Sequence, residues 1–155
     1  MAHEIGHSFD ELGNIYDTHG RLHSWWTAED RARYKSAAAK LAAQLDAYCP
    51  HPDLCVKGQQ VLGESVNDLA GLLVAHDAYV QSLKGKPDVV IGGLTGEQRF
   101  FLSFARRWRK IQTEASLRTQ ITTDTHAPAE YRADAVRNVD AWYEAFQSDQ
   151  TISFS

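Results

Sequence analysis

The feature that most constrains this chain is the pentapeptide His-Glu-Ile-Gly-His at residues 3–7. On an α-helix, side chains four residues apart lie on one face, one turn apart. His3 and His7 can therefore offer ring nitrogens to a single metal ion, with the carboxylate of Glu4 beside them. The plainer alternative is that these polar residues lie on an exposed helical turn. A metal site requires a further ligand from another segment.

Such a segment lies at residues 62–73, where Glu64 and Asp68 interrupt a run rich in Leu, Val and Ala. Burying two carboxylates together costs free energy unless a cation or strong donors are near. Two histidines also leave a catalytic zinc one protein ligand short. We therefore predict that Glu64 is the third ligand and that Asp68 accepts a hydrogen bond from a zinc-bound histidine. The alternative is that both carboxylates face solvent on an amphipathic helix.

Five segments of the chain carry a resemblance to a known family. They read, in order, HEIGHSFDELG, LHSWWT, GESVNDLAG, GLTGEQRFFLSFARRWR and TDTHAPAEYR. They resemble the HExxHxFD, WWT, GENxADxGG, GLTxxQxFFxxxA and DxHxPxxxR motifs of the neprilysin and endothelin-converting-enzyme family of zinc metallopeptidases. The resemblance runs from Met1 to about Phe146, and five ordered motifs are far more specific than HExxH alone.

The resemblance implies a mainly α fold with few or no strands, the catalytic C-terminal subdomain of a thermolysin-like (gluzincin) zinc peptidase. It implies one Zn2+ per chain, held by His3, His7 and Glu64. Glu4 matches the family's catalytic glutamate, a general base that activates water. The implied reaction is hydrolysis of peptide bonds in small peptides by a zinc-dependent metalloendopeptidase, with a peptide as its substrate partner.

The resemblance also assigns roles around the metal. Asp10 matches the aspartate that would hold His7, and Asp68 matches the aspartate that orients a ligand histidine. His126 matches a histidine that stabilises the oxyanion of the tetrahedral intermediate. Arg132 matches the arginine that contacts substrate carbonyl groups. An imidazole N–H with a nearby guanidinium suits a developing negative charge, because both groups donate hydrogen bonds.

The chain departs from the family pattern in two ways. Ser65 stands where the family has asparagine, and Asn67 stands where it has alanine, although neither is a metal ligand. Family members are also several times longer. We therefore expect residues 1–155 to form a single domain, a catalytic fragment whose partner is the missing N-terminal part of the same enzyme. In the family, that part supplies a helical cap and a strand that holds the substrate backbone.

Two alternatives of other classes stay open. One is a non-catalytic zinc- or peptide-binding fragment that lacks the upstream substrate-binding half. The other is a helical bundle with a vacant site, which predicts no tight metal binding. We expect the isolated chain to bind zinc yet cleave peptides poorly, because it shows no strand that could hold a peptide backbone by edge pairing.

Composition agrees with one folded domain outside a membrane. The chain has 155 residues, of which 43% are hydrophobic, enough to bury a core without disulfides or a partner. A net charge of −4 argues against binding to nucleic acid. No stretch approaches the roughly 18 apolar residues of a membrane span. No signal peptide is visible, and the resemblance implies that the full-length protein is extracytoplasmic, either periplasmic or secreted.

Two cysteines and two further histidines offer weaker signals. Cys49 and Cys55 flank a short proline-containing loop that could close as a disulfide in an oxidising compartment. A second metal site that includes His51 matches no common zinc pattern. His19 and His23 are also four apart, but a glycine between them favours a turn.

Hydrophobic spacing and end signals predict the helices. We expect them over residues 1–12, about 27–48, 61–84, from Thr95 onwards, about 128–138 and 139–147. Capping boxes at Thr27 and Thr95 mark two of the starts. The aromatic stripe of the helix that follows Thr95 predicts core packing; it consists of Phe100, Phe101, Phe104 and Trp108. Residues 83–93 are expected to form a mobile linker.

Overall fold

The computed structural model describes residues 1–147, and its regular elements are helices. They are α1 (Ala2–Gly6), the 3-10 helix η1 (Gly13–Ile15), α2 (Ala28–Asp46), α3 (Gly58–Ser82), α4 (Gly96–Arg107), α5 (Glu114–Thr123), α6 (Ala129–Ala133), the 3-10 helix η2 (Asp134–Asn138) and α7 (Asp140–Phe146). Isolated β-bridges occur, but no strand forms within residues 1–147. The predicted mainly helical class is confirmed.

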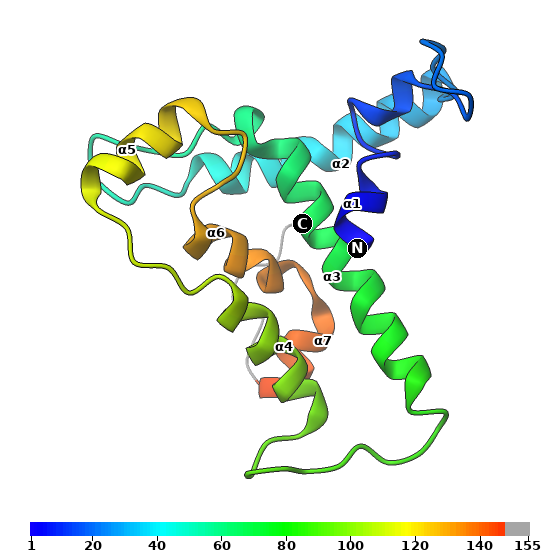
Figure 1. Cartoon of the computed structure of the whole chain (residues 1–155), viewed down its shortest axis with the longest axis vertical. Coiled ribbons are helices and arrows are strands. Elements are labelled where there is room, and N and C mark those ends of the chain that lie inside the picture. The colour runs from blue at the N-terminus through cyan, green and yellow to red at the C-terminus, as the bar shows by residue number, and fades with distance from the viewer. Residues whose placement is uncertain (148–155) are drawn as a thin grey trace.

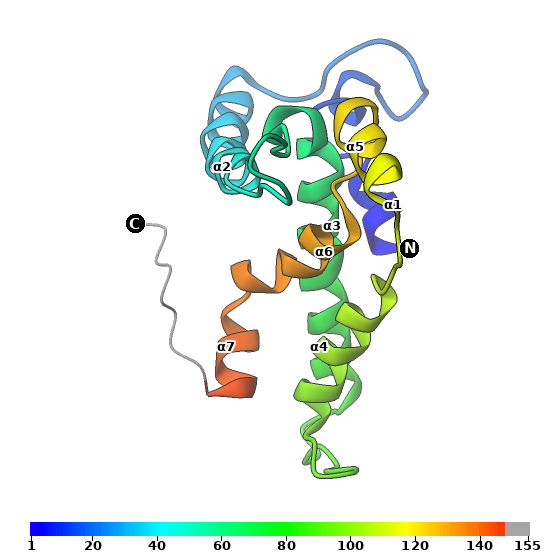
Figure 2. The same cartoon turned by 90° about the vertical axis from the view of Figure 1, so that its left-hand side faces the viewer.

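Helix α3 runs through the middle of the molecule. Both views show α1 alongside it and α2 against its N-terminal half (Figure 1, Figure 2). The 3-10 helix η2 also packs on α3, while α4 and α7 pack against each other. This arrangement brings the first residues of the chain beside α3, whose N-terminal half carries Glu64 and Asp68.

Small clusters of buried apolar side chains hold the helices together. One joins α2 to α3, a second anchors the loop before α6, and a third joins α3 to α4 and to the segment from η2 to α7. Their buried members are Ala38, Ala42 and Leu62 in the first, Leu45, Val56, Val61 and Ala127 in the second, and Leu72, Phe101, Val136 and Val139 in the third. The second cluster fixes the residue directly after His126, so packing positions that histidine.

Both predicted capping boxes are confirmed. Thr27 and Asp30 exchange hydrogen bonds at the start of α2, and Thr95 and Gln98 do the same at the start of α4. Within the aromatic stripe of α4, Phe101 is buried, and its neighbours pack partly buried around it. Trp108 differs from the prediction, because it ends α4 partly exposed at the rim of an open cleft.

The predicted opening helix over residues 1–12 is wrong in length. Helix α1 covers only Ala2–Gly6, and the chain then continues in turns to Leu12. The cause lies in Asp10, whose Oδ1 accepts the backbone N–H groups of Leu12 and Gly13 at 2.9 and 2.8 Å. Local side-chain acceptors of this kind compete with helical hydrogen bonding. The sequence pattern for a helix was therefore right at His3 and wrong beyond His7.

Three further differences concern the second half of the chain. Helix α5 (Glu114–Thr123) was not predicted, although Thr113 caps it by accepting the N–H of Ser116. Pro128 precedes α6 as its N-cap and is not its first helical residue. The predicted helix over 128–138 turns into 3-10 geometry at Asp134. Residues 83–95 connect α3 to α4, and the mobility predicted for residues 83–93 stays a prediction.

The approach of α1 to α3 depends on Gly71. A β-carbon built at this position would lie 3.0 Å from the backbone nitrogen of His3 and 3.2 Å from its Cα. A side chain there would push α1 outward. Because His3 stands at this contact, the absence of a side chain at Gly71 sets how close its ring comes to α3.

The loop between α2 and α3 is closed by a disulfide between Cys49 and Cys55. Both sulfurs are therefore unable to act as thiolate ligands, which excludes the alternative of a metal site with His51. Asp53 in the same loop pairs with Arg118 of α5 at 2.8 Å. The loop is thus tied to the helix that leads into the segment of His126.

Candidate metal centre

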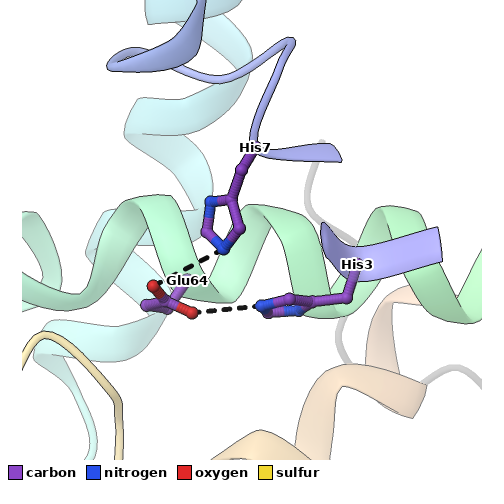
Figure 3. Close-up of side chains that lie close together, drawn as sticks. All are labelled: His3, His7 and Glu64. Carbon is purple, nitrogen blue, oxygen red and sulfur yellow. Dashed lines mark hydrogen bonds and ion pairs between the residues drawn. The ribbon is translucent and has the colours of Figure 1, made fainter. Parts of the chain in front are cut away.

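The three predicted metal ligands converge from segments distant in sequence: His3 lies on α1, His7 directly follows it, and Glu64 lies on α3 (Figure 3). The Nε2 of His3 lies 3.1 Å from Oε2 of Glu64, and the Nε2 of His7 lies 3.7 Å from Oε1 of the same carboxylate. Ligand atoms about 2.0–2.1 Å from a tetrahedral zinc lie roughly 3.3 Å apart. Among residues 1–147, no other group of His, Cys, Asp or Glu side chains gathers three potential ligand atoms so closely. The donor set and its spacing fit zinc.

Asp68 contacts the ring nitrogen of His3 that faces away from Glu64. Its Oδ1 lies 3.0 Å from Nδ1 of His3, which leaves Nε2 directed at Glu64. The side chain of Asp68 is 5% exposed and that of Glu64 is 17% exposed. The alternative that both carboxylates face solvent is therefore wrong. The contact is the one expected for an aspartate that orients a ligand histidine.

The charge of Asp68 is balanced by Arg132 from α6. The guanidinium is bidentate, with Nε 2.6 Å from Oδ2 and Nη2 2.7 Å from Oδ1. Its central carbon also lies 4.1 Å from the centre of the Trp108 ring, a cation–π contact. The burial of Asp68 therefore needs no metal ion to explain it, because the carboxylate already has a cation; the predicted metal contact of Glu64 stays a prediction.

Asp10 supports His7 in a different manner. Its Oδ2 lies 2.8 Å from Nδ1 of His7 and accepts a hydrogen bond from Nδ2 of Asn67, also at 2.8 Å. Its Oδ1 accepts the N–H groups of Leu12 and Gly13. The buried carboxylate is thereby surrounded by donors on both oxygens.

These contacts shift the proton affinities of the pair. The hydrogen bond to Asp10 raises the pKa of His7, and this outweighs the lowering effect of burial. Burial alone would raise the pKa of Asp10, but hydrogen bonds from Gly13, His7 and Asn67 lower it below its usual range. Both shifts favour an imidazolium–carboxylate pair when no metal is present.

His126 reaches the same glutamate from the loop before α6. Its Nε2 lies 3.1 Å from Oε2 of Glu64, and its Nδ1 lies 2.8 Å from Oδ1 of Asp124. The backbone N–H of His126 donates to the same oxygen at 2.9 Å and, with the ring, lowers the pKa of Asp124. Asp124 is not among the predicted site residues, although the DxH spacing of its motif is a signal for this contact.

An open cleft of about 640 Å3 borders the ligand cluster. It is lined by the exposed Glu4, by His126, Arg132 and Trp108, and by apolar side chains that include Phe104. Its volume is in the range of small-molecule sites. The indole Nε1 of Trp108 is buried and has no hydrogen-bond partner among the residues described. Polar and apolar groups thus meet beside the predicted metal ligands.

The structure also bears on membrane insertion. Within residues 1–147, no helix combines the length and the apolar character that crossing a membrane requires.

Comparison with known sequences places the chain in one family. Residues 1–154 match the model of peptidase family M13. An endothelin-converting enzyme homolog of Locusta migratoria is 35% identical over 135 residues, which cover 85% of this chain and 18% of that protein. Neprilysin-3 of Drosophila melanogaster is 33% identical over 153 residues, which cover 95% of this chain and 19% of that protein. The chain thus spans about a fifth of the length of these curated relatives.

Solved structures agree. The zinc metalloprotease Zmp1 of Mycobacterium tuberculosis, in complex with an inhibitor, superposes with a TM-score of 0.92 at 42% identity; the match covers 96% of this chain and 24% of that one. PepO of a Lactobacillus gives a TM-score of 0.81 at 35% identity, over 97% of this chain and 22% of that one. Family model, relatives and fold all point the same way, as the five ordered motifs predict: the chain belongs to peptidase family M13, the family of neprilysin and the endothelin-converting enzymes.

Proposed function

We propose that this chain binds one Zn2+ through His3, His7 and Glu64 and is the catalytic part of a metalloendopeptidase that cleaves small peptides. The observation that carries the proposal is the convergence of the three ligand atoms, which all lie within 4.8 Å of one another. The relatives named above as endothelin-converting enzyme, neprilysin and zinc metalloprotease support the reaction class.

Bound zinc would polarise the scissile carbonyl and lower the pKa of a water molecule. Glu4 lies next to His3 on α1, is exposed, and lines the cleft. Its carboxylate is thus placed to accept a proton from the attacking water and to pass it to the leaving amine. Glu4 makes the chemistry possible without building the metal site.

His126 is proposed to donate from Nε2 to the oxyanion of the tetrahedral intermediate. Asp124 accepts from its Nδ1 and so holds the ring with Nε2 directed at Glu64. Arg132 is proposed to contact substrate carbonyl groups at the cleft. Its Nε and Nη2 are engaged by Asp68, so the remaining N–H groups of the guanidinium would serve the substrate.

A specific observation favours a second candidate, a domain that binds zinc without turnover. Residues 1–147 contain no strand on which a peptide backbone could be held by edge pairing. Correct positioning of reactants can contribute about 7–11 kcal/mol to lowering a barrier. We propose that the remainder of the family's polypeptide supplies this positioning. The disulfide at Cys49 fits an extracytoplasmic location.

The test combines metal titration with a peptide assay. The metal-free chain is titrated with Zn2+, and a fluorescence-quenched peptide is then offered to the zinc-loaded chain and to Glu4→Gln. One bound Zn2+ per chain with turnover that disappears in Glu4→Gln would support the peptidase. One bound Zn2+ without turnover would support the second candidate. Absence of zinc binding, or turnover that persists in Glu4→Gln, would overturn the assigned roles.

A further inference from the structure

Asn67 is a buried amide next to the metal centre, at a position where the family pattern has alanine. It lies on α3, is 1% exposed, and is among the largest fully buried side chains of the described residues. Burying an amide costs free energy unless its polar atoms are hydrogen-bonded. A side chain larger and more polar than the pattern requires, placed beside a ligand histidine, needs a physical reason.

The hydrogen bonds of Asn67 supply that reason. Its Nδ2 donates to Oδ2 of Asp10 at 2.8 Å and lies 2.8 Å from Nδ1 of His7. Because Nδ1 of His7 is also 2.8 Å from that oxygen, the ring and the amide meet at one carboxylate oxygen. The carboxylate oxygen can only accept, so the proton of the neutral His7 ring lies on Nδ1. The 2.8 Å contact between this nitrogen and Nδ2 of Asn67 then joins two donors and is not a hydrogen bond. The lone pair then remains on Nε2, which faces Glu64.

Gly6 packs closely against the side-chain amide of Asn67. A β-carbon built at Gly6 would collide with Oδ1 of Asn67 and would lie 3.1 Å from its Cγ. The HExxH pattern leaves residue 6 free, so this restriction arises from Asn67 and not from the metal ligands. The two residues form a size-complementary pair that connects α1 to α3.

We propose that Asn67 is a positioning residue of the metal centre, at a position where the family pattern has alanine. It fixes the carboxylate of Asp10 and, through it, the rotation and tautomer of His7. The role rests on the proposed zinc site but goes beyond it, since zinc could bind with alanine at this position. Gly6 is required as long as Asn67 is present.

The experiment compares Zn2+ affinity in five variants with the wild type, one of them the double variant Gly6→Ala/Asn67→Ala. Asn67→Asp replaces the donor with a second carboxylate and should weaken Zn2+ by about 10- to 100-fold. Asn67→Ala leaves Asp10 its other donors and should weaken Zn2+ roughly tenfold. Gly6→Ala should weaken Zn2+ in the wild type but add nothing to Asn67→Ala, because the collision is then gone. Ser65→Ala is the matched control, since Ser65 is buried on α3 but borders a different pocket.

Affinity is measured by competition with a chelator, and Co2+ is used as a second probe. The visible spectrum of bound Co2+ reports ligand geometry in the folded, metal-saturated chain, so a change in stability alone would not move it. We expect the spectrum to change in Asn67→Asp and Asn67→Ala but not in Ser65→Ala. If both Asn67 variants match the control in affinity and spectrum, the role of Asn67 is overturned while the zinc site stands. A wild type that binds no Zn2+ would overturn both.

Discussion

His7 is supported from its own neighbourhood in the chain, whereas His3 is supported from elements far along it. Asp10 lies in the turn directly after His7 and is satisfied by N–H groups and an amide. Asp68 lies on α3 and is neutralised by a full charge, that of Arg132. The two proposed histidine ligands are thus held by supports of opposite kinds, one of uncharged donors and one of a charged partner.

The difference has a structural consequence. The support of His7 forms once α1 meets α3, because only Asn67 comes from outside the local segment. The support of His3 also needs α6 for Arg132 and the end of α4 for Trp108. The site is therefore complete only when the second half of the chain has packed on α3.

The largest effect should come from Glu64, the carboxylate that both His3 and His7 face. Glu64→Ala should abolish stoichiometric Zn2+ binding, because both histidines face this carboxylate and two imidazoles leave the site one protein ligand short. His3→Ala and His7→Ala should do the same, whichever support they lose. Metal analysis after dialysis measures the loss. Glu4→Gln is the matched control and should retain one Zn2+; loss of metal in that variant would contradict the division between ligands and base.

The second largest effect should separate the two supports by stability. Arg132→Ala leaves the buried carboxylate of Asp68 without its cation, and breaking one partner of a buried pair costs about 3–5 kcal/mol. The free energy of unfolding of the metal-free chain, measured with urea, should fall by that order. Asn67→Ala, which removes only one of the donors around Asp10, should cost clearly less.

The control for this comparison is the double variant Asp68→Ala/Arg132→Ala. It removes both charges, so it should be more stable than Arg132→Ala alone. If the two variants were equally unstable, the cost would stem from lost packing of Arg132 on Trp108, and the contrast between charged and uncharged supports would fail.

Zinc affinity should distinguish the supports more finely. Asp68→Ala should weaken Zn2+ by about 10- to 100-fold, because His3 loses the acceptor at its Nδ1. The same change also frees the guanidinium of Arg132 near the metal, which adds repulsion of the cation. Asp10→Ala should therefore weaken Zn2+ by less than Asp68→Ala. Chelator competition measures both, and the reverse order would show that the local support matters more.

The features that the sequence predicted correctly are set by residues close together in the chain. The spacing of His3 and His7, the carboxylates at Glu64 and Asp68, and the capping boxes at Thr27 and Thr95 depend on neighbours within a turn or two. The ordered motifs then implied the family and the mainly helical fold, both of which are confirmed. That His3, His7 and Glu64 act as zinc ligands stays a proposal, supported by their spacing.

What the sequence could not predict arises from contacts between distant segments. The pairing of Arg132 with Asp68, the position of Trp108 over that guanidinium and the burial of Asn67 all depend on how α4, α6 and α1 meet α3. The early end of α1 had a local cause, the acceptor at Asp10. A short polar side chain after the second histidine is a signal for such an early helix end, but the helical spacing of the histidines favoured a longer helix.

The smallest expected effect is a pH dependence confined to the support of His7. The pKa of His7 is raised, so its contribution to the stability of the metal-free chain is complete below the ordinary value of 6.5 and is lost as the pH rises through the raised pKa. The pKa of Asp10 is lowered, so its contribution is present above the ordinary value of 3.8 and is lost as the pH falls through the lowered pKa. The pair therefore stabilises the metal-free chain most between these two limits.

Asp10→Asn should flatten this profile at both ends, since the acceptor of His7 loses its charge. The measurement is the melting temperature of the metal-free chain and of the variant at intervals between pH 3 and pH 8. The side chain of His7 is 35% exposed, so solvent screens the pair and the change should be small. Asp124→Asn is a matched control at another aspartate–histidine contact, and it should alter the acid limb because the pKa of Asp124 is lowered. If Asp10→Asn left the alkaline limb intact, the titration would belong to another group, and the pairing of His7 with Asp10 would not be the local support described here.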